Sequence, residues 1–205
     1  NAPFYGGWNE IVIARKAPRR VRVVVDHGLA TTARRKAIAG KLPADVKLEA
    51  FLNCGSGQIN DKTDTVRITQ TSGRSYSFTK GKIAGLVPTQ GLISFDNKEV
   101  VFEISGLAAG RRYRANLTWW DFDTALRKQS VLVSDIAGRG AVCAIKPTPL
   151  PSYKSKKQLP AELSFPLDQL RTKAGKCKLI VRKEGVHNSV ICEIWITSKN
   201  PGAAK

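Results

Sequence analysis

The longest alternation of apolar and polar side chains in the chain runs from residue 112 to residue 120. A period of two is typical of a β-strand that has one buried face and one face in water. The face that we expect to be buried carries Tyr113, Ala115, Leu117 and Trp119. The opposite face carries Arg112, Arg114, Asn116, Thr118 and Trp120. The strand therefore places an indole ring beside cationic and hydrogen-bonding groups.

Shorter apolar and β-branched runs, separated by Gly, Asn and Pro, recur along the chain and predict further strands. We expect them at residues 10–14, 20–25, 46–52, 65–69, 76–79, 92–95, 100–104, 128–133 and 140–146, with a closing hairpin over 178–196. Residues 31–39 and 166–173 favour short helices, and the four prolines of 147–160 favour a loop. Many short strands with close turn signals predict an all-β fold, an antiparallel β-sandwich. We divide the chain into an N-terminal extension (1–45, strands packed on the main domain), a sandwich domain (46–198) and a C-terminal tail (199–205).

Several segments resemble known β-sandwich families. The run Gly-Leu-Ala-Ala-Gly-Arg-Arg-Tyr at 106–113 resembles the corner of fibronectin type III and galactose-binding-like sandwiches. Residues 117–133 resemble malectin-type carbohydrate-binding modules, and 178–196 is similar to their closing hairpin. Residues 51–55 are similar to their opening segment. The resemblance covers roughly residues 46–198, and it implies a jelly-roll or galactose-binding-like fold that binds carbohydrate.

The net charge of the chain limits the classes of partner that it is expected to bind. There are 34 Lys and Arg residues against 16 Asp and Glu, for a net charge of +18. Such a field favours anionic partners, which include nucleic acid, anionic lipid and acidic or sulfated polysaccharide. No apolar run approaches the ~20 residues of a transmembrane helix. The basic residues are spread along the chain, so a solvated surface is the alternative interpretation.

Four cysteines lack the Cys-X-X-Cys spacing of a zinc site, and they fit either two disulfides or reduced core thiols. Three connectivities are possible. We predict Cys177–Cys192, because both lie on the expected inward faces of the closing hairpin, and by default Cys54–Cys143. Two bridges imply an oxidising compartment, so we expect a secreted, periplasmic or cell-surface protein. The absence of methionine indicates a processed or excised chain.

Nothing in the sequence favours catalysis. Only His27 and His187 could act as imidazole bases, and both fall in expected turn or surface positions without a nucleophile elbow. Asp121 and Asp123 end the alternating strand, where carboxylates cap a turn or bind a structural calcium ion. We expect a protein that is not an enzyme and has no other cofactor.

These observations predict a non-catalytic module that binds an acidic or sulfated carbohydrate or another anionic polymer. Its ligand-binding residues would be Trp120, Arg112, Arg114 and Asn116, with Asp121 and Asp123 at the edge. An exposed indole stacks on a sugar ring, and arginine binds sulfate or carboxylate bidentately. The site loses its platform if a loop or the N-terminal extension covers Trp120. One alternative is a structural subunit of an extracellular assembly, by self-association or within a larger complex. The other is a basic nucleic-acid-binding or coat-type sandwich.

Overall fold

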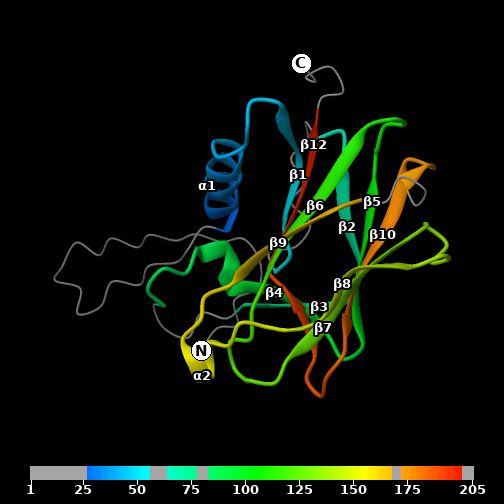
Figure 1. The fold of residues 1–205 in the computed structure, drawn as a ribbon. Coiled ribbons are helices and arrows are strands. Elements are labelled where there is room, and N and C mark those ends of the chain that lie inside the picture. Colours follow the sequence, from blue (N-terminus) through cyan, green and yellow to red (C-terminus); the bar gives the residue numbers. More distant parts are fainter. Residues whose placement is uncertain (1–26, 56–63, 78–82, 168–171, 200–205) are drawn as a thin grey trace, which may run out of the picture.

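A computed structural model describes residues 27–55, 64–77, 83–167 and 172–199 of the chain. The strands expected at 10–14 and 20–25 lie outside these ranges. The described residues form three antiparallel sheets, two of which face each other as the layers of a sandwich (Figure 1). The predicted all-β fold class is thus confirmed.

The first sheet has the strand order β1 (Val46–Asn53), β12 (Glu193–Lys199), β6 (Arg112–Trp119) and β9 (Ala161–Pro166). The second sheet has the order β2 (Arg67–Ser72), β5 (Glu99–Ser105), β10 (Lys176–Lys183), β7 (Lys128–Ser134) and β8 (Val142–Pro149). A small third sheet joins β11 (Ser189–Ile191), β4 (Leu92–Asp96) and β3 (Arg74–Ser77). The helical elements are α1 (His27–Ala39), the 3-10 turn η1 (Pro88–Gly91) and α2 (Tyr153–Lys156).

The core lies between the first two sheets. The alternating residues of β6 supply part of the face that the first sheet turns toward this core. Tyr113, Leu117 and Trp119 are all buried there, as expected. They belong to one apolar cluster with residues of the second sheet that include Phe102 and Leu179. Burial of such large side chains is the main stabilising contribution to a two-layer fold.

The turn before β6 has the local geometry that the resemblance to a sandwich corner implies. The Ala108 amide donates a hydrogen bond to the Tyr113 hydroxyl at 2.9 Å, which fastens the turn to the strand. Gly106 has a φ of +78°, and a Cβ there would lie 2.0 Å from the Thr65 carbonyl oxygen. Only glycine meets both conditions without strain. Gly110 has a φ of +75°, but nothing lies within 4 Å of its Cβ position.

α1 covers part of the outer face of the first sheet (Figure 1). Ile38 packs with Phe51 of β1 and Trp195 of β12. The expected helix at 31–39 is confirmed, although it begins earlier, at His27. The described part of the N-terminal extension therefore contributes a helix to the sandwich.

A buried carboxylate fixes α1 to the sheet. Glu193 is fully buried, and its two oxygens accept from Nε and Nη2 of Arg34, each at 3.1 Å. Thr118 Oγ1 donates to it at 3.0 Å, and Thr89 Oγ1 also donates. Arg34 Nη2 reaches Glu162 of β9 at 2.7 Å as well. This network links the helix, η1 and three strands of the first sheet.

Two segments between β8 and β10 differ from the sequence-based prediction. The loop expected at 147–160 contains the end of β8 and the short helix α2. Strand β9 was not predicted at all; it runs over 161–166, so Pro166 ends a strand instead of beginning a helix. Its apolar residues Ala161, Leu163 and Phe165 face inward, and among the described residues β9 is the edge strand beside β6.

Neither predicted disulfide is present in this structure, where all four cysteines carry free thiols. Cys143 is exposed on β8, whereas Cys54 is buried, so these two are not placed to meet. Cys177 lies on β10 of the second sheet and Cys192 directly precedes β12 of the first. The expected hairpin does not exist, because β11 joins the third sheet and the chain crosses between the layers.

Candidate functional site

The exposed end of β6 presents two arginines on the outer face of the first sheet. Arg112 and Arg114 are exposed, and Asn116 beside them is half-buried. Lys199 lies opposite Arg112 on β12, and Thr197 lies opposite Arg114. Arg114 Nε donates to the Ser164 hydroxyl at 3.0 Å, and Asn116 donates to the Trp195 carbonyl and the Thr197 hydroxyl at 3.3 Å each. Only the first part of the predicted water-exposed face is open, because Thr118 farther along the same face is buried against Glu193. We call Arg112, Arg114, Asn116, Thr197 and Lys199 the basic sheet face.

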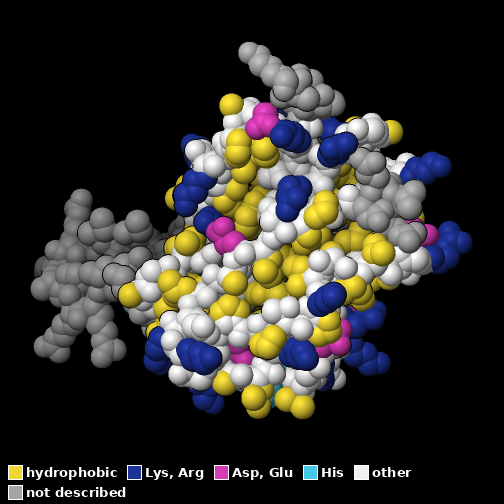
Figure 2. Space-filling model, in the orientation of Figure 1, with side chains coloured by type: hydrophobic (Ala, Val, Ile, Leu, Met, Phe, Trp, Pro, Cys, Tyr) yellow, Lys and Arg dark blue, Asp and Glu magenta, His cyan; other side chains and the backbone are white. Residues whose placement is uncertain are grey.

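Among the described residues, the acidic groups around the basic sheet face pair with lysines and with Arg111, and not with Arg112 or Arg114. Glu49 of β1 binds Arg111 at 3.0 Å and Lys47 at 3.2 Å. Asp45 binds Lys199 at 3.0 Å. Within the described part of the chain, neither Arg112 nor Arg114 forms an ion pair with a carboxylate. Figure 2 shows other Lys and Arg side chains spread over the visible surface, so positive charge alone does not distinguish this face.

Trp120 is not the exposed platform that we predicted, since it is fully buried. β6 ends at Trp119, so the alternation that would have pointed Trp120 outward stops one residue earlier. Its ring packs against Phe122 at 6.0 Å and against Tyr153 of α2 at 5.9 Å between centroids. The alternative considered above is correct: the segment after β8 covers this indole.

Asp121 is buried in a turn that Arg127 completes. Its carboxylate accepts from the Thr124 amide at 2.8 Å, the Arg127 amide at 3.0 Å and Arg127 Nη1 at 2.6 Å. Burial by itself would raise the pKa of the Asp121 carboxyl, but hydrogen bonds from Thr124 and Arg127 and the charge of Arg127 hold it below its usual value. Asp123, about half exposed, also pairs with Arg127.

The guanidinium of Arg127 thus supplies the positive charge that the two aspartates need. No group of three His, Cys, Asp or Glu side chains placed to hold a metal occurs in the described ranges, which gives the calcium interpretation no geometric support. Asp121 and Trp120 serve the turn and the core, and they do not join the basic sheet face.

An aromatic cluster that the sequence did not predict lies at the opposite end of β6. Tyr76 of β3 is 45% exposed, and its ring stacks on Phe122 with centroids 6.4 Å apart and planes 13° apart. Phe95 meets the Tyr76 ring edge-on, with centroids 6.4 Å apart. The Arg74 guanidinium lies over the Phe95 ring, 5.2 Å from its centroid. We call Tyr76, Phe95, Phe122 and Arg74 the aromatic patch. The neighbours come from three segments far apart in sequence, so no local motif could have revealed the patch.

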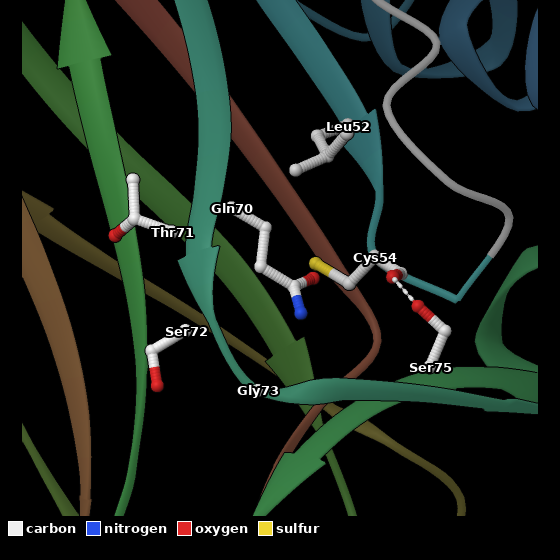
Figure 3. A pocket seen from close by; sticks show the side chains of 7 residues that line it. All are labelled: Leu52, Cys54, Gln70, Thr71, Ser72, Gly73 and Ser75. Carbon is white, nitrogen blue, oxygen red and sulfur yellow. Dashed lines mark hydrogen bonds between the residues drawn. The ribbon is translucent and has the colours of Figure 1, made fainter.

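A small polar cleft of about 250 Å³ lies between the end of β1 and the β2–β3 corner (Figure 3). Its wall is mostly hydroxyl and amide groups: Gln70, Thr71, Ser72 and Ser75, with Leu52, Cys54 and Gly73. Gln70 accepts from Ser94 Oγ at 2.5 Å, and Ser75 Oγ donates to the Cys54 carbonyl at 3.4 Å. The described residues that line the cleft include neither an imidazole nor a charged side chain.

No protein-family model and no curated protein matches the chain. Its fold is shared with solved structures. In the crystal structure of plant peptide RALF23 in complex with FER and LLG2, the matched chain is 12% identical with a TM-score of 0.57, over 80% of this chain and 52% of that one. The ANXUR1 extracellular domain from Arabidopsis thaliana is 9% identical with a TM-score of 0.54, over 76% and 49%. A calcium-binding mutant of Bacteroides uniformis β-glucuronidase 2 is 10% identical with a TM-score of 0.51, over 77% and 18%.

This likeness defines the class of fold, an all-β sandwich of the kind found in these plant extracellular domains. It agrees with the fold that the resemblance to malectin-type modules implies. The chain spans about half the length of the plant chains that it matches.

Proposed function

We propose that the chain is a non-catalytic binding module for an acidic or sulfated carbohydrate, which it holds on the basic sheet face. The observation that carries the proposal is the pair of exposed arginines at alternate positions of β6, neither of which pairs with a carboxylate of the described residues. Two like charges on one face of a strand, left without a counter-ion from the protein, favour a bound anion.

The groups around the arginines suit a sugar that carries an anionic substituent. Guanidinium groups bind sulfate or carboxylate through two parallel hydrogen bonds. The Ser164 and Thr197 hydroxyls and the Asn116 amide add neutral partners of the kind that sugar hydroxyls require. Trp120 and Asp121 drop out of the proposed contact set because they are buried.

The decisive experiment compares two double variants that lose equal charge. Arg112→Ala/Arg114→Ala removes the proposed contacts, whereas Arg67→Ala/Arg139→Ala removes two arginines from β2 and from the turn after β7. Binding to a sulfated glycan is measured by calorimetry in low and moderate salt. We expect the first variant to lose roughly ten- to a hundredfold in affinity, as partly exposed charge-assisted contacts do, and the second to lose far less.

Equal losses in both variants would show that net charge, and not this face, attracts the glycan. No binding of the unmodified chain to any acidic glycan would refute the proposal. A single-stranded nucleic acid of matched length serves as a competitor. If it displaces the glycan and binds more tightly, the face recognises polyanions in general.

A second candidate function, binding of a neutral sugar ring, is favoured by the exposed Tyr76 ring. Flat aromatic rings present an apolar face that stacks on sugars, and the stack on Phe122 fixes the orientation of this ring. Tyr76→Phe retains the ring and Tyr76→Ala removes it. A neutral oligosaccharide that binds the former and not the latter would support this candidate, and equal binding to both would oppose it.

We place the protein outside the cell or at its surface. The ANXUR1 structure, which shares the fold, is of an extracellular domain. No helix in the described part of the chain is long and apolar enough to cross a membrane.

A further inference from the structure

We infer that Cys54 and Cys192 are the partners of a disulfide that forms when the chain folds under oxidising conditions. Cys54 directly follows β1 and Cys192 directly precedes β12, and these strands are antiparallel neighbours. Their register ends at the pair Asn53 and Glu193, so the two cysteines are the next residues opposite each other. The Cys54 amide donates to the Cys192 carbonyl at 2.9 Å, which extends the pairing to the cysteines themselves.

Both side chains point into the same layer of the core. The residues two positions along each strand, Leu52 and Ile194, are inward-facing members of the main core cluster. Cys54 and Cys192 belong to that cluster too. Directly opposed residues of an antiparallel pair have Cα atoms roughly 4.5–5.5 Å apart. That separation lies within the range of about 4.4–6.8 Å that a disulfide spans.

The other two cysteines have no such partner. Cys177 lies on β10, where its opposite residue on β5 is Ile104. Cys143 lies on the edge strand β8, is exposed, and directs its thiol to the Ile145 carbonyl at 3.3 Å. Within the described residues, the backbone pairing therefore brings only one pair of cysteines together, and it differs from both pairs that the sequence indicated.

The environment of the two thiols indicates when the bond forms. Burial raises the pKa of Cys54 and of Cys192 well above the usual range, and each lies near the Glu193 carboxylate, which raises it further. Thiolates are the attacking species in disulfide exchange, so exchange in the folded state is slow. Cys54 lines the polar cleft, and Figure 3 shows its sulfur directed toward the side where Gln70 lies.

The reaction is a two-electron exchange with an external low-molecular-weight disulfide. One cysteine thiolate attacks the external disulfide and releases one thiol. The second cysteine thiolate then attacks the mixed disulfide, forms the internal bond and releases the other thiol. The two cysteine protons end on the two released thiols. The internal bridge closes a loop that contains every strand from β2 to β11, and bridges across long loops constrain the unfolded chain most.

The test refolds the full chain in oxidised and reduced glutathione and identifies the products by mass spectrometry. We expect a mass lower by two hydrogens, two thiols that alkylate after denaturation, and a non-reduced digest that links the Cys54 peptide to the Cys192 peptide. Cys54→Ser and Cys192→Ser should each abolish the loss of mass. Cys143→Ser and Cys177→Ser, the matched controls, should keep it.

Four alkylated thiols in the refolded wild-type protein would overturn the inference, and so would a link that involves Cys177 or Cys143. The peptide map of the wild-type protein decides the question even if a serine variant fails to fold. As a second readout, reductant should lower the Tm of the wild-type protein and leave that of Cys54→Ser unchanged. The outcome is independent of any carbohydrate binding.

Discussion

Replacing Arg34 with methionine should destabilise the fold because it leaves the Glu193 carboxylate buried without its cation. The Arg34 side chain is 8% exposed and that of Glu193 is 0% exposed, so water cannot compensate for the lost partner. Removal of one member of a buried ion pair costs roughly 3–5 kcal/mol. Hydroxyl donors from Thr89 and Thr118 remain, so we expect the lower end of that range.

For a chain of this length, about 3 kcal/mol corresponds to a decrease in Tm of roughly 6–12 °C. Urea denaturation gives the free energy of unfolding directly, and an unchanged m value would show that the unfolded state is the same. The double variant Arg34→Met/Glu193→Gln removes both charges. We expect its loss of unfolding free energy to be smaller than the sum of the losses in the two single variants, because no unpaired charge remains in the core.

Glu193→Gln alone supplies the matched control. Arg34 would keep its contact with Glu162, whose side chain is 58% exposed, so this variant should lose less than Arg34→Met. If Arg34→Met unfolds within about 0.5 kcal/mol of the wild type, the range of ordinary surface changes, the network does not hold α1. Strict additivity in the double variant would equally refute the reasoning.

Three further predictions concern the corner and the turn at the two ends of β6. Gly106→Ala should lower the free energy of unfolding, measured by urea denaturation, clearly more than Gly110→Ala. Both glycines have a positive φ, which costs about 1–2 kcal/mol for a residue with a Cβ. Only at Gly106 would the added Cβ also clash with a backbone carbonyl, that of Thr65. Tyr113→Phe should lower stability by about 0.5–1.5 kcal/mol through the lost hydrogen bond, and an unchanged denaturation midpoint would contradict that. Because the pKa of Asp121 is lowered in the folded state, its contribution is present above the unfolded value of about 4 and is lost as the pH falls through the folded value. Asp121→Asn should therefore be less stable at neutral pH and show a weaker acid dependence, and a parallel acid profile would refute this.

Much of the sandwich could be predicted from local pattern. The inward face of β6 and most other strands, with α1, appear within a few residues of the expected positions. The segment before β6 that resembles a sandwich corner does form a turn, whose glycine conformation and tyrosine hydrogen bond act over only a few residues. Strand β9 was missed although Ala161, Leu163 and Phe165 alternate with polar residues, because the strand is short and lies between prolines that indicated a loop before it and a helix after it.

The candidate site was only partly predictable. Arg112, Arg114 and Asn116 were assigned to the correct face, since side-chain direction within one strand follows from its period of two. Trp120 was assigned wrongly because its burial depends on Tyr153, which is distant in sequence, and on the end of β6. Sequence alone also gave no sign of the Tyr76 stack on Phe122.

The amino-acid sequence by itself therefore determined the fold class, the two faces of β6 and the excess of positive charge, because these depend on spacing between neighbours and on composition. Tertiary structure alone decided which aromatic ring meets solvent and that Cys54 lies opposite Cys192. Each of these depends on contacts between segments that the chain brings together only when the sheets assemble. Local pattern carries no information about such pairings, since many arrangements of the same strands satisfy it equally well.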